Sequence, residues 1–359
     1  MDAGEVSDSS SMKVFTSIQS EFTCAKDGSI RDSKGHPWLI WKIVDFQRWW
    51  HAFETIAGVP LGRKLMNAAA DQEEYLFEQA SFFKKGWWMK KKRLQTSLSE
   101  RWTQLGWGRY EHQSSSIFSH LLAPICSGFA LAAVEGLNAE RQKVQWHQLS
   151  HVQIKLELDK DERSLSQAPQ PPIFTWDSTT NYAEFIEIGA VQLDFQKVED
   201  GWTHSGERTC FLPSGLFQRL FDYVRMQGIV PRPDILATWE LPTDAEFSSW
   251  VPLILTSLAV NEVISQSERP IYIQDLESWQ QLANAYLRPF GFGTFIALTA
   301  LDGQGGVEFE LPPSPNLPFT VGFLASFWQR GIGRKPLVKI QQKNGNWLVQ
   351  ITSFLSYSD

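Results

Sequence analysis

Apolar residues recur with a helical period in two similar places along this chain. Between residues 46 and 57 they return every three or four positions, which predicts a helix with one buried face: Phe46, Trp49, Trp50, Phe53, Ile56 and Ala57. The same spacing continues after Pro213 and Ser214, which are typical of a helix start, through Phe217, Leu220, Phe221 and Val224. Gly58 and Gly228 then mark the two helix ends.

Each of these segments is followed, further along, by a buried helix and a hairpin. The mainly apolar stretches 122–135 and 318–328 are too long for one strand, so we expect buried helices there. Segments 337–341 and 347–351 flank Asn344-Gly345, whose residues accept the positive φ of a tight hairpin turn. Segments 144–147 and 152–158 alternate in the same way. The order predicts an α+β fold with helices packed on antiparallel sheets.

Short motifs repeat between the two regions. The matching pairs are Phe46-Gln47-Arg48 with Phe217-Gln218-Arg219, Gly106-Trp107-Gly108 with Gly291-Phe292-Gly293, and Gly128-Phe129 with Gly322-Phe323. The separation between partners widens along the chain, as insertions in loops would make it. A period this long predicts two tandem domains that form an intramolecular pseudo-dimer, each large enough to bury a core of its own. We expect a disordered tail at 1–12, a first domain at 13–159, a Pro-rich linker at 160–173 and a second domain at 174–359.

Composition is that of a water-soluble globular protein, apart from its tryptophans. The chain has 359 residues, 43% hydrophobic and 20% charged, with a net charge of −7 that disfavours a surface coated by nucleic acid. Its 16 Trp residues predict deep cores or surfaces that meet an apolar ligand, a membrane or a protein. Three cysteines without close spacing and the lack of a signal or membrane-span pattern predict a cytoplasmic protein without disulfides.

One segment of the first region, residues 82–93, interleaves aromatic and cationic side chains. Its candidate contact residues are Lys84, Lys85, Trp87, Trp88, Lys90, Lys91, Lys92 and Arg93. Rings that favour the headgroup region and cations that reach phosphates would suit an anionic membrane surface, and on this interpretation the protein would be a peripheral membrane protein. The same alternation would suit single-stranded nucleic acid, which the acidic balance disfavours. The third interpretation is a helix with a core-facing apolar side and solvated lysines.

Three stretches of the first region resemble the four-vinyl-reductase domain. They are 106–111 (Gly-Trp-Gly-Arg-Tyr-Glu), 123–129 (Ala-Pro-Ile-Cys-Ser-Gly-Phe) and the hairpin 143–158, and 291–352 looks like a diverged copy. The resemblance implies a fold related to small TRAPP subunits and haem-based nitric-oxide sensors. It also implies binding of hydrophobic small molecules, a role in assembly, or an accessory role in reduction of a tetrapyrrole vinyl group. Unlike many members of the family, neither hairpin here carries a cysteine, Thr320 replaces the first cysteine in the second copy, and no haem-ligating signature is present.

Catalytic and metal-binding patterns are scarce. The Gly-rich segment 303–306 leads into a strand-like stretch and not into a helix, and segment 331–335 lacks the spacing of a phosphate loop. The histidines lack a close ligand pair: His112, His120, His147 and His151. We therefore expect a non-enzymatic binding protein for an apolar small molecule, with no assigned catalytic residue, metal or cofactor. The alternative is a scaffold that docks onto a larger protein complex. The residues expected to line the apolar pocket are Trp49, Trp50, Phe53, Trp107, Cys126 and Phe129.

Overall fold

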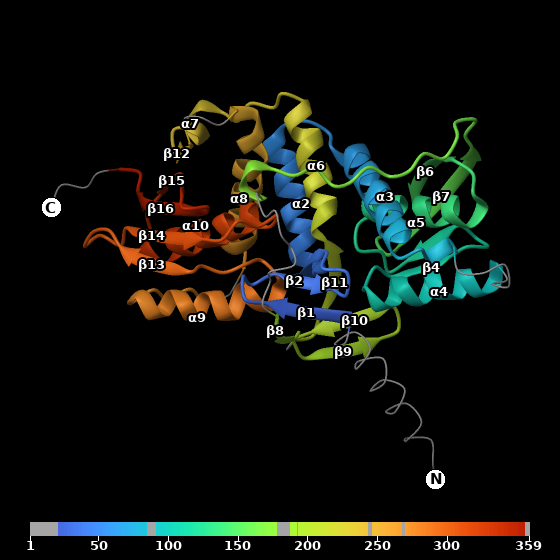
Figure 1. The fold of residues 1–359 in the computed structure, drawn as a ribbon, viewed down its shortest axis with the longest axis horizontal. Helices are drawn as coiled ribbons and strands as arrows, with labels where there is room; N and C mark the ends of the chain where they lie inside the picture. The colour runs from blue at the N-terminus through green and yellow to red at the C-terminus, as the bar shows by residue number, and fades with distance from the viewer. Residues whose placement is uncertain are drawn as a thin grey trace, which may run out of the picture.

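The computed structural model describes residues 21–84, 91–177, 187–191, 193–242, 246–267 and 270–355. The tail predicted at 1–12 lies outside these ranges. Within them the fold is α+β, as the sequence predicts, with helices packed on three sheets whose pairings are antiparallel except for one. The sheets follow one another along the long axis of the molecule (Figure 1). We call residues 21–160 the first half and residues 187–355 the second half.

The central sheet is built by both halves. Its strand order is β8-β1-β2-β3-β11-β10-β9. The two halves meet where β3 pairs with β11 in an antiparallel register that sets Trp41 opposite Cys210 and Trp38 opposite Pro213. The strands are β1 (Phe22–Ala25), β2 (Ile30–Asp32), β3 (Pro37–Lys42), β8 (Glu187–Ala190), β9 (Phe195–Val198), β10 (Gly201–His204) and β11 (Glu207–Pro213).

Each half also has an outer sheet, which ends in the predicted hairpin. The first has the order β4-β5-β7-β6 and the second the order β12-β15-β16-β14-β13. Asn344 (φ 52°) and Gly345 (φ 82°) make the tight turn of the second hairpin, as predicted. The strands are β4 (Arg109–Glu111), β5 (Ser116–Phe118), β6 (Gln142–Gln148), β7 (Gln153–Lys160), β12 (Trp239–Glu240), β13 (Ala297–Ala300), β14 (Val307–Leu311), β15 (Pro336–Lys343) and β16 (Asn346–Ser353).

The helices confirm the predicted helical segments. Gly58 ends α2 in the left-handed conformation (φ 68°), and Pro213 precedes α6. The helices are α2 (Ile43–Ala57), α3 (Gly62–Gln79), α4 (Lys91–Gln104), α5 (Ala123–Asn138), α6 (Ser214–Met226), α7 (Pro233–Leu236), α8 (Phe247–Ser265), α9 (Leu276–Tyr286) and α10 (Leu317–Ile332). Short 3₁₀ turns are η1 (Phe82–Lys84), η2 (Thr175–Asp177) and η4 (Arg288–Phe290).

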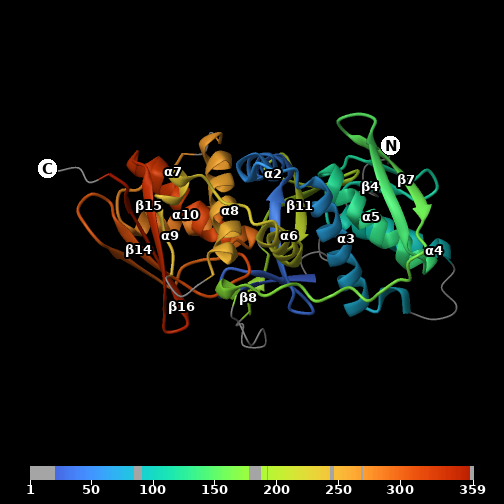
Figure 2. The same cartoon turned by 90° about the horizontal axis from the view of Figure 1, so that it is seen from above.

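The first helix of each half packs against the other half. α2 lies against α8, and α6 lies against α3 (Figures 1 and 2). Between them, aromatic rings from both halves touch: Phe319 lies 5.4 Å from Trp49 and 5.0 Å from Phe217, measured between ring centroids. One continuous hydrophobic cluster therefore runs through both halves. The expectation of a separate core in each domain does not describe this interior.

Helix α8 is apolar because other helices surround it. An 18-residue window of it has a mean hydropathy of 1.4, so by length and composition it could cross a membrane, although no membrane-span pattern was expected from the sequence. However, 67% of that window is buried inside the structure, where α8 packs against α2, α6 and α10. Contact with helices on several sides removes the need for a polar face.

Candidate functional site

The six residues predicted to line an apolar pocket all lie in the packed core. Trp50 is 6% exposed and the other five are fully buried. Trp49 and Phe53 contact each other on α2, with ring centroids 5.0 Å apart, and Trp107 stacks on Phe129 at 3.9 Å. The structure thus gathers Trp49, Trp50 and Phe53 in one group and Trp107, Cys126 and Phe129 in another. None of the six lines a cavity described below.

Cys126 has a clear structural role. Its thiol donates a hydrogen bond to the carbonyl oxygen of Trp107 (3.5 Å), and burial raises the pKa of this thiol to about 11. In the second half, the Thr320 hydroxyl donates to the carbonyl oxygen of Phe292, the middle residue of the matching Gly-aromatic-Gly motif. A protonated thiol buried in this way is a poor nucleophile. The exchange of Cys for Thr therefore preserves a hydrogen bond between helix and turn.

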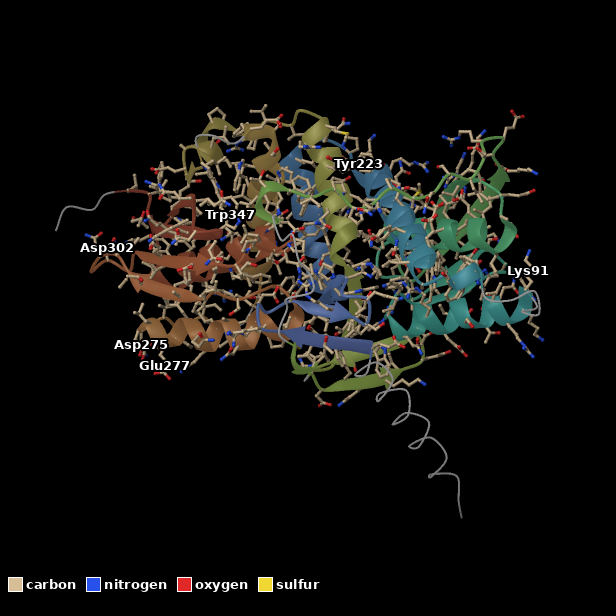
Figure 3. All side chains as sticks on the ribbon, viewed as in Figure 1. Lys91, Tyr223, Asp275, Glu277, Asp302 and Trp347 are labelled. Carbon is tan, nitrogen blue, oxygen red and sulfur yellow. The ribbon has the colours of Figure 1, made fainter. Side chains whose placement is uncertain are left out.

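The basic aromatic segment is only partly described. Lys85, Trp87, Trp88 and Lys90 lie outside the described residues, and nothing is shown of the Lys84 side chain. Lys91, Lys92 and Arg93 are exposed at the start of α4, and Lys91 Nζ donates to Asn138 Oδ1 (2.8 Å). Figure 3 places Lys91 at one end of the molecule. Contact with a membrane or a nucleic acid through this segment stays a prediction.

The histidines of the first half are dispersed. Burial lowers the pKa of His112 to about 4, and burial is also the main cause of the lowered pKa of His120. His147 Nε2 lies 3.3 Å from Glu157 Oε2 on the exposed face of the β6–β7 hairpin. Among the residues that the structure describes, no cluster of three or more His, Cys, Asp or Glu side chains could hold a metal ion.

A charged cavity of about 560 Å³ lies between α3, α5, the outer strand β6 and the linker. We call it the charged groove. Helix α3 contributes residues spaced by three and four, and β6 contributes the run 142–145. Its charged and phenolic side chains are Arg63, Asp71, Glu135, Arg141, Lys143, Arg163 and Tyr223.

Carboxyl groups in and beside the charged groove have pKa values raised above their ordinary values. Burial raises the pKa of Glu74 to about 6, with further upward contributions from Glu135, Asp71 and Glu78. Burial likewise raises the pKa of Asp71 and of Glu135. Arg141 offsets part of this repulsion, since its Nη1 lies 2.8 Å from Glu135 Oε2 and 3.5 Å from Glu74 Oε2.

The linker is fastened across this surface by two arginines. Arg141 Nη2 donates to Ser166 Oγ (3.3 Å), and Arg219 Nη2 donates to the carbonyl oxygen of Pro169. Arg219 is 5% exposed, and its Nε donates to Gln72 Oε1 (3.1 Å). Burial lowers the pKa of this guanidinium, although Asp71 opposes the shift. The Pro-rich segment is therefore an ordered strap over α3 and α6 (Figure 1).

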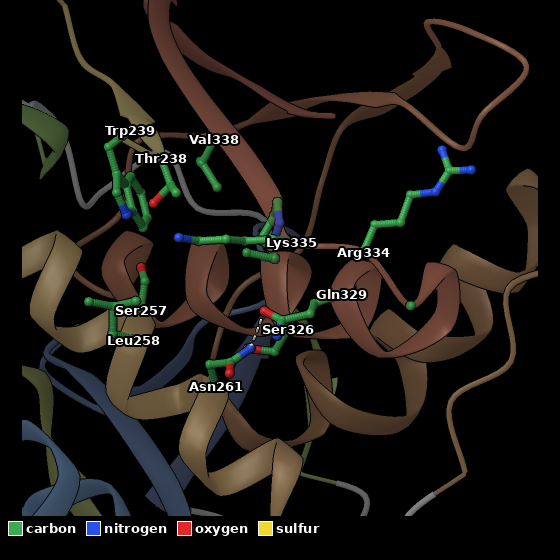
Figure 4. Close-up of a pocket in the computed structure, with 13 residues that line it drawn as sticks. Thr238, Trp239, Ser257, Leu258, Asn261, Ser326, Gln329, Arg334, Lys335 and Val338 are labelled. Carbon is green, nitrogen blue, oxygen red and sulfur yellow. Dashed lines mark hydrogen bonds between the residues drawn. The ribbon is translucent and has the colours of Figure 1, made fainter. Parts of the chain in front are cut away.

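A second cavity, of about 520 Å³, occupies the corresponding place in the second half (Figure 4). It lies between α8, α10 and the outer strand β15. Asn261 Nδ2 donates to Ser326 Oγ (3.3 Å) and to Gln329 Oε1 (3.1 Å). In Figure 4, Lys335 extends across the cavity towards Trp239, while Arg334 points away. Strand β12, which carries Trp239, forms one wall.

Sequence reasoning did not find the charged groove. Adjacent acidic residues such as Glu73 and Glu74 are typical of a solvated helix face, but Glu73 is fully buried and pairs with Arg101 at 2.7 and 2.8 Å. Glu73 can be buried because Arg101 of α4 reaches this side of α3 and neutralises its carboxylate. A usable signal was present in the sequence, because Asp71 and Glu74 share one face of a helix rich in alanine.

Comparisons of the chain with models of protein families, with curated proteins and with solved structures found no significant match.

Proposed function

We propose that the chain is a fusion of two like modules that interlock as a pseudo-dimer. The contacts between the halves support this, because they come in reciprocal pairs. Gly106 of the first half lies so close to β11 that a Cβ would be 2.3 Å from the Thr209 carbonyl oxygen. Gly291 of the second half lies equally close to β3, where a Cβ would be 2.5 Å from the Trp38 carbonyl oxygen. Each Gly-aromatic-Gly turn thus docks on a central strand of the other half.

We infer that this pseudo-dimer is a non-catalytic scaffold that docks onto partner proteins. One observation supports this most: the aromatic side chains that an apolar carrier would use to line its pocket are buried in the packed core. Several of them lie between the two halves and hold them together. Trp49, for example, contacts Phe217 and Phe319 of the second half. A rigid body of this kind presents fixed surfaces, and two of its cavities are grooves between helices and outer strands.

Site-specific photo-crosslinking in the native cell tests this function. The photoreactive residue replaces, one at a time, three exposed side chains on separate surfaces: Gln145 on β6, Lys335 beside the second cavity, and Glu277 on α9 (Figure 3). A scaffold gives a reproducible crosslink to one protein from at least one surface and none from the others. Crosslinks to no protein at any of the three, with a small molecule bound to the purified chain, would overturn the proposal.

A second candidate, a carrier of an apolar small molecule, is favoured by one smaller cavity. Its volume is about 440 Å³, and Phe77, Phe83, Ala132 and Leu165 form an apolar part of its wall. It adjoins the basic aromatic segment, which would bring the cavity to a membrane surface. Native mass spectrometry of the purified protein should then show an added mass, and Ala132→Trp, which fills the cavity, should abolish it. A spectrum of the chain alone counts against the carrier.

A further inference from the structure

The outer strands of the two hairpins differ in how their free edges are covered. In the second half, β12 adds to β15 as a parallel strand, with Trp239 opposite Val338 and Glu240 opposite Lys339. The Val338 N–H donates to the Thr238 carbonyl oxygen (2.9 Å). In the first half, β6 is the last strand of its sheet. Val144 of β6 occupies the position that Val338 has on β15, since each follows its Gly-Phe pair in the preceding helix by the same interval.

The register of the hairpin shows which backbone groups face the open edge. The Arg141 carbonyl accepts from the Asp161 N–H, and the Leu149 N–H donates to the Gln153 carbonyl, each at 2.9 Å. Because pairing alternates along an antiparallel strand, the odd-numbered residues of β6 bond to β7. The even-numbered residues therefore direct their N–H and C=O groups outwards.

Part of this edge is already covered by the protein's own side chains. Glu135 accepts from the Gln142 N–H (2.7 Å), and Arg63 Nη1 donates to the Val144 carbonyl oxygen (3.0 Å). The Val144 N–H and the outward N–H and C=O groups of Trp146 and Gln148 lie along the rest of the edge, where no other strand of the described residues pairs with them. Such a row of donors and acceptors is a template for another strand.

The surroundings provide room and a charge preference. The charged groove runs beside residues 142–145 of β6. Within the groove, Asp71 is a further acidic residue, and Arg141 and Arg163 are neutralised by Glu135 and Asp161. At the β6 edge itself, Arg63 bonds to a neutral carbonyl and Lys143 is exposed. In a chain with a net charge of −7, this is a local site that favours acidic side chains. At the hairpin tip, Leu149 (59% exposed) and Val152 (43% exposed) extend the surface with apolar groups.

We propose that β6 is a docking site for an extended, acidic segment of a partner protein, which joins the outer sheet as a strand parallel to β6, as β12 joins β15. The proposal rests on the scaffold function and assigns its docking site. Backbone hydrogen bonds to Val144, Trp146 and Gln148 hold the segment. Its carboxylates meet Lys143 and Arg63, which set the preference for acidic residues.

A phage-displayed library of random heptapeptides, panned on the full chain, supplies the probe. The proposal expects selected peptides rich in Asp and Glu, whose binding is measured by fluorescence anisotropy. Lys143→Glu should weaken binding about tenfold or more, as loss and reversal of a charge contact would. Lys197→Glu, an equally exposed change on the edge strand β9, is the matched control and should have no effect.

Val144→Pro tests the backbone contact, because proline removes the outward N–H and leaves the bonds to β7 in place. It should abolish binding while circular dichroism shows a folded chain. Should this variant unfold, N-methylation of alternate residues in the peptide removes the same hydrogen bonds from the other partner. No selected peptide, or binding insensitive to Lys143→Glu and to N-methylation, would overturn the β6 site. Crosslinks from Lys335 or Glu277 alone would then leave the scaffold function standing with another docking surface.

Discussion

Replacing Phe319 with alanine tests whether the two halves are one cooperative unit. Phe319 lies on α10 of the second half, is fully buried, and touches rings of both halves: Trp41 at 5.7 Å, Trp49 at 5.4 Å, Phe217 at 5.0 Å, Phe292 at 5.9 Å and Phe221 at 6.3 Å between centroids. Burying a phenylalanine removes about 150–250 Å² from water, which at about 25 cal/mol per Å² corresponds to about 4–6 kcal/mol. Measured losses for such truncations are about 3–5 kcal/mol. For Phe319→Ala we expect the free energy of unfolding to fall by about 3–5 kcal/mol.

The assay is urea denaturation followed by far-ultraviolet circular dichroism and by tryptophan fluorescence, since the 16 Trp residues are spread over both halves. Two matched variants report on one half each. Phe129→Ala removes a fully buried ring that stacks on Trp107, and Phe309→Ala removes one packed against Trp279. Because the hydrophobic cluster is continuous, all three variants should shift the same single transition in both signals.

Two separate transitions would refute this reasoning, especially if Phe129→Ala moved one of them and Phe309→Ala the other. The halves would then be independent domains that merely touch. A Phe319→Ala loss below about 1 kcal/mol would also contradict it, because cavities of this size relax only partly in a packed core.

Three further predictions concern the groove and the turns. Glu74 has its pKa raised from 4.5 to about 6, so the native state binds more protons in that range and the free energy of unfolding falls as the pH rises through it. Glu74→Gln should therefore stabilise the protein at pH 7.5 but not at pH 4.5 in urea titrations, with Glu262→Gln, an exposed change on α8, as the control. Cys126→Thr keeps the hydrogen bond to the turn, as Thr320 does, and should cost less stability than Cys126→Val, which leaves a buried carbonyl unpaired at about 1–3 kcal/mol. Gly128→Ala would place a Cβ 2.2 Å from the Met66 carbonyl oxygen and should lower the melting temperature by forcing α5 from α3; an unchanged temperature would contradict this packing.

Local elements of this fold could be predicted from sequence because their signals are local. The period of Phe46, Trp49 and Phe53 fixes one face of α2, and Asn344-Gly345 fixes the turn of the last hairpin. The sequence could not show that α2 packs against the opposite half, since an apolar helix face does not indicate which element will cover it. For the same reason Trp49 and Phe53 were expected in a pocket of one domain. Their apolar character was correctly identified, but their surroundings depend on residues such as Phe319 that lie far along the chain.

The charged groove was missed for a related reason. The raised pKa of Glu74 depends on the burial that surrounds it, and the strap over α3 depends on Arg219 of the other half. Charge patterns along one helix give the spacing of Asp71 and Glu74, but not their desolvation. The hydrogen-bond roles of Cys126 and Thr320 were likewise visible only after both turns were placed.

The pairing of β3 with β11 also bears on how the chain is made. Trp41 and Cys210 lie opposite each other in the register, so the ribosome must translate well past β11 before the central sheet can close. At about 5–20 residues per second, the first half waits on the order of 10–30 s with the partner faces of β3 and α2 uncovered. Those faces carry Trp38, Trp41 and Trp49, which are buried in the finished protein. The nascent first half therefore exposes these aromatic side chains to solvent until the second half has been made.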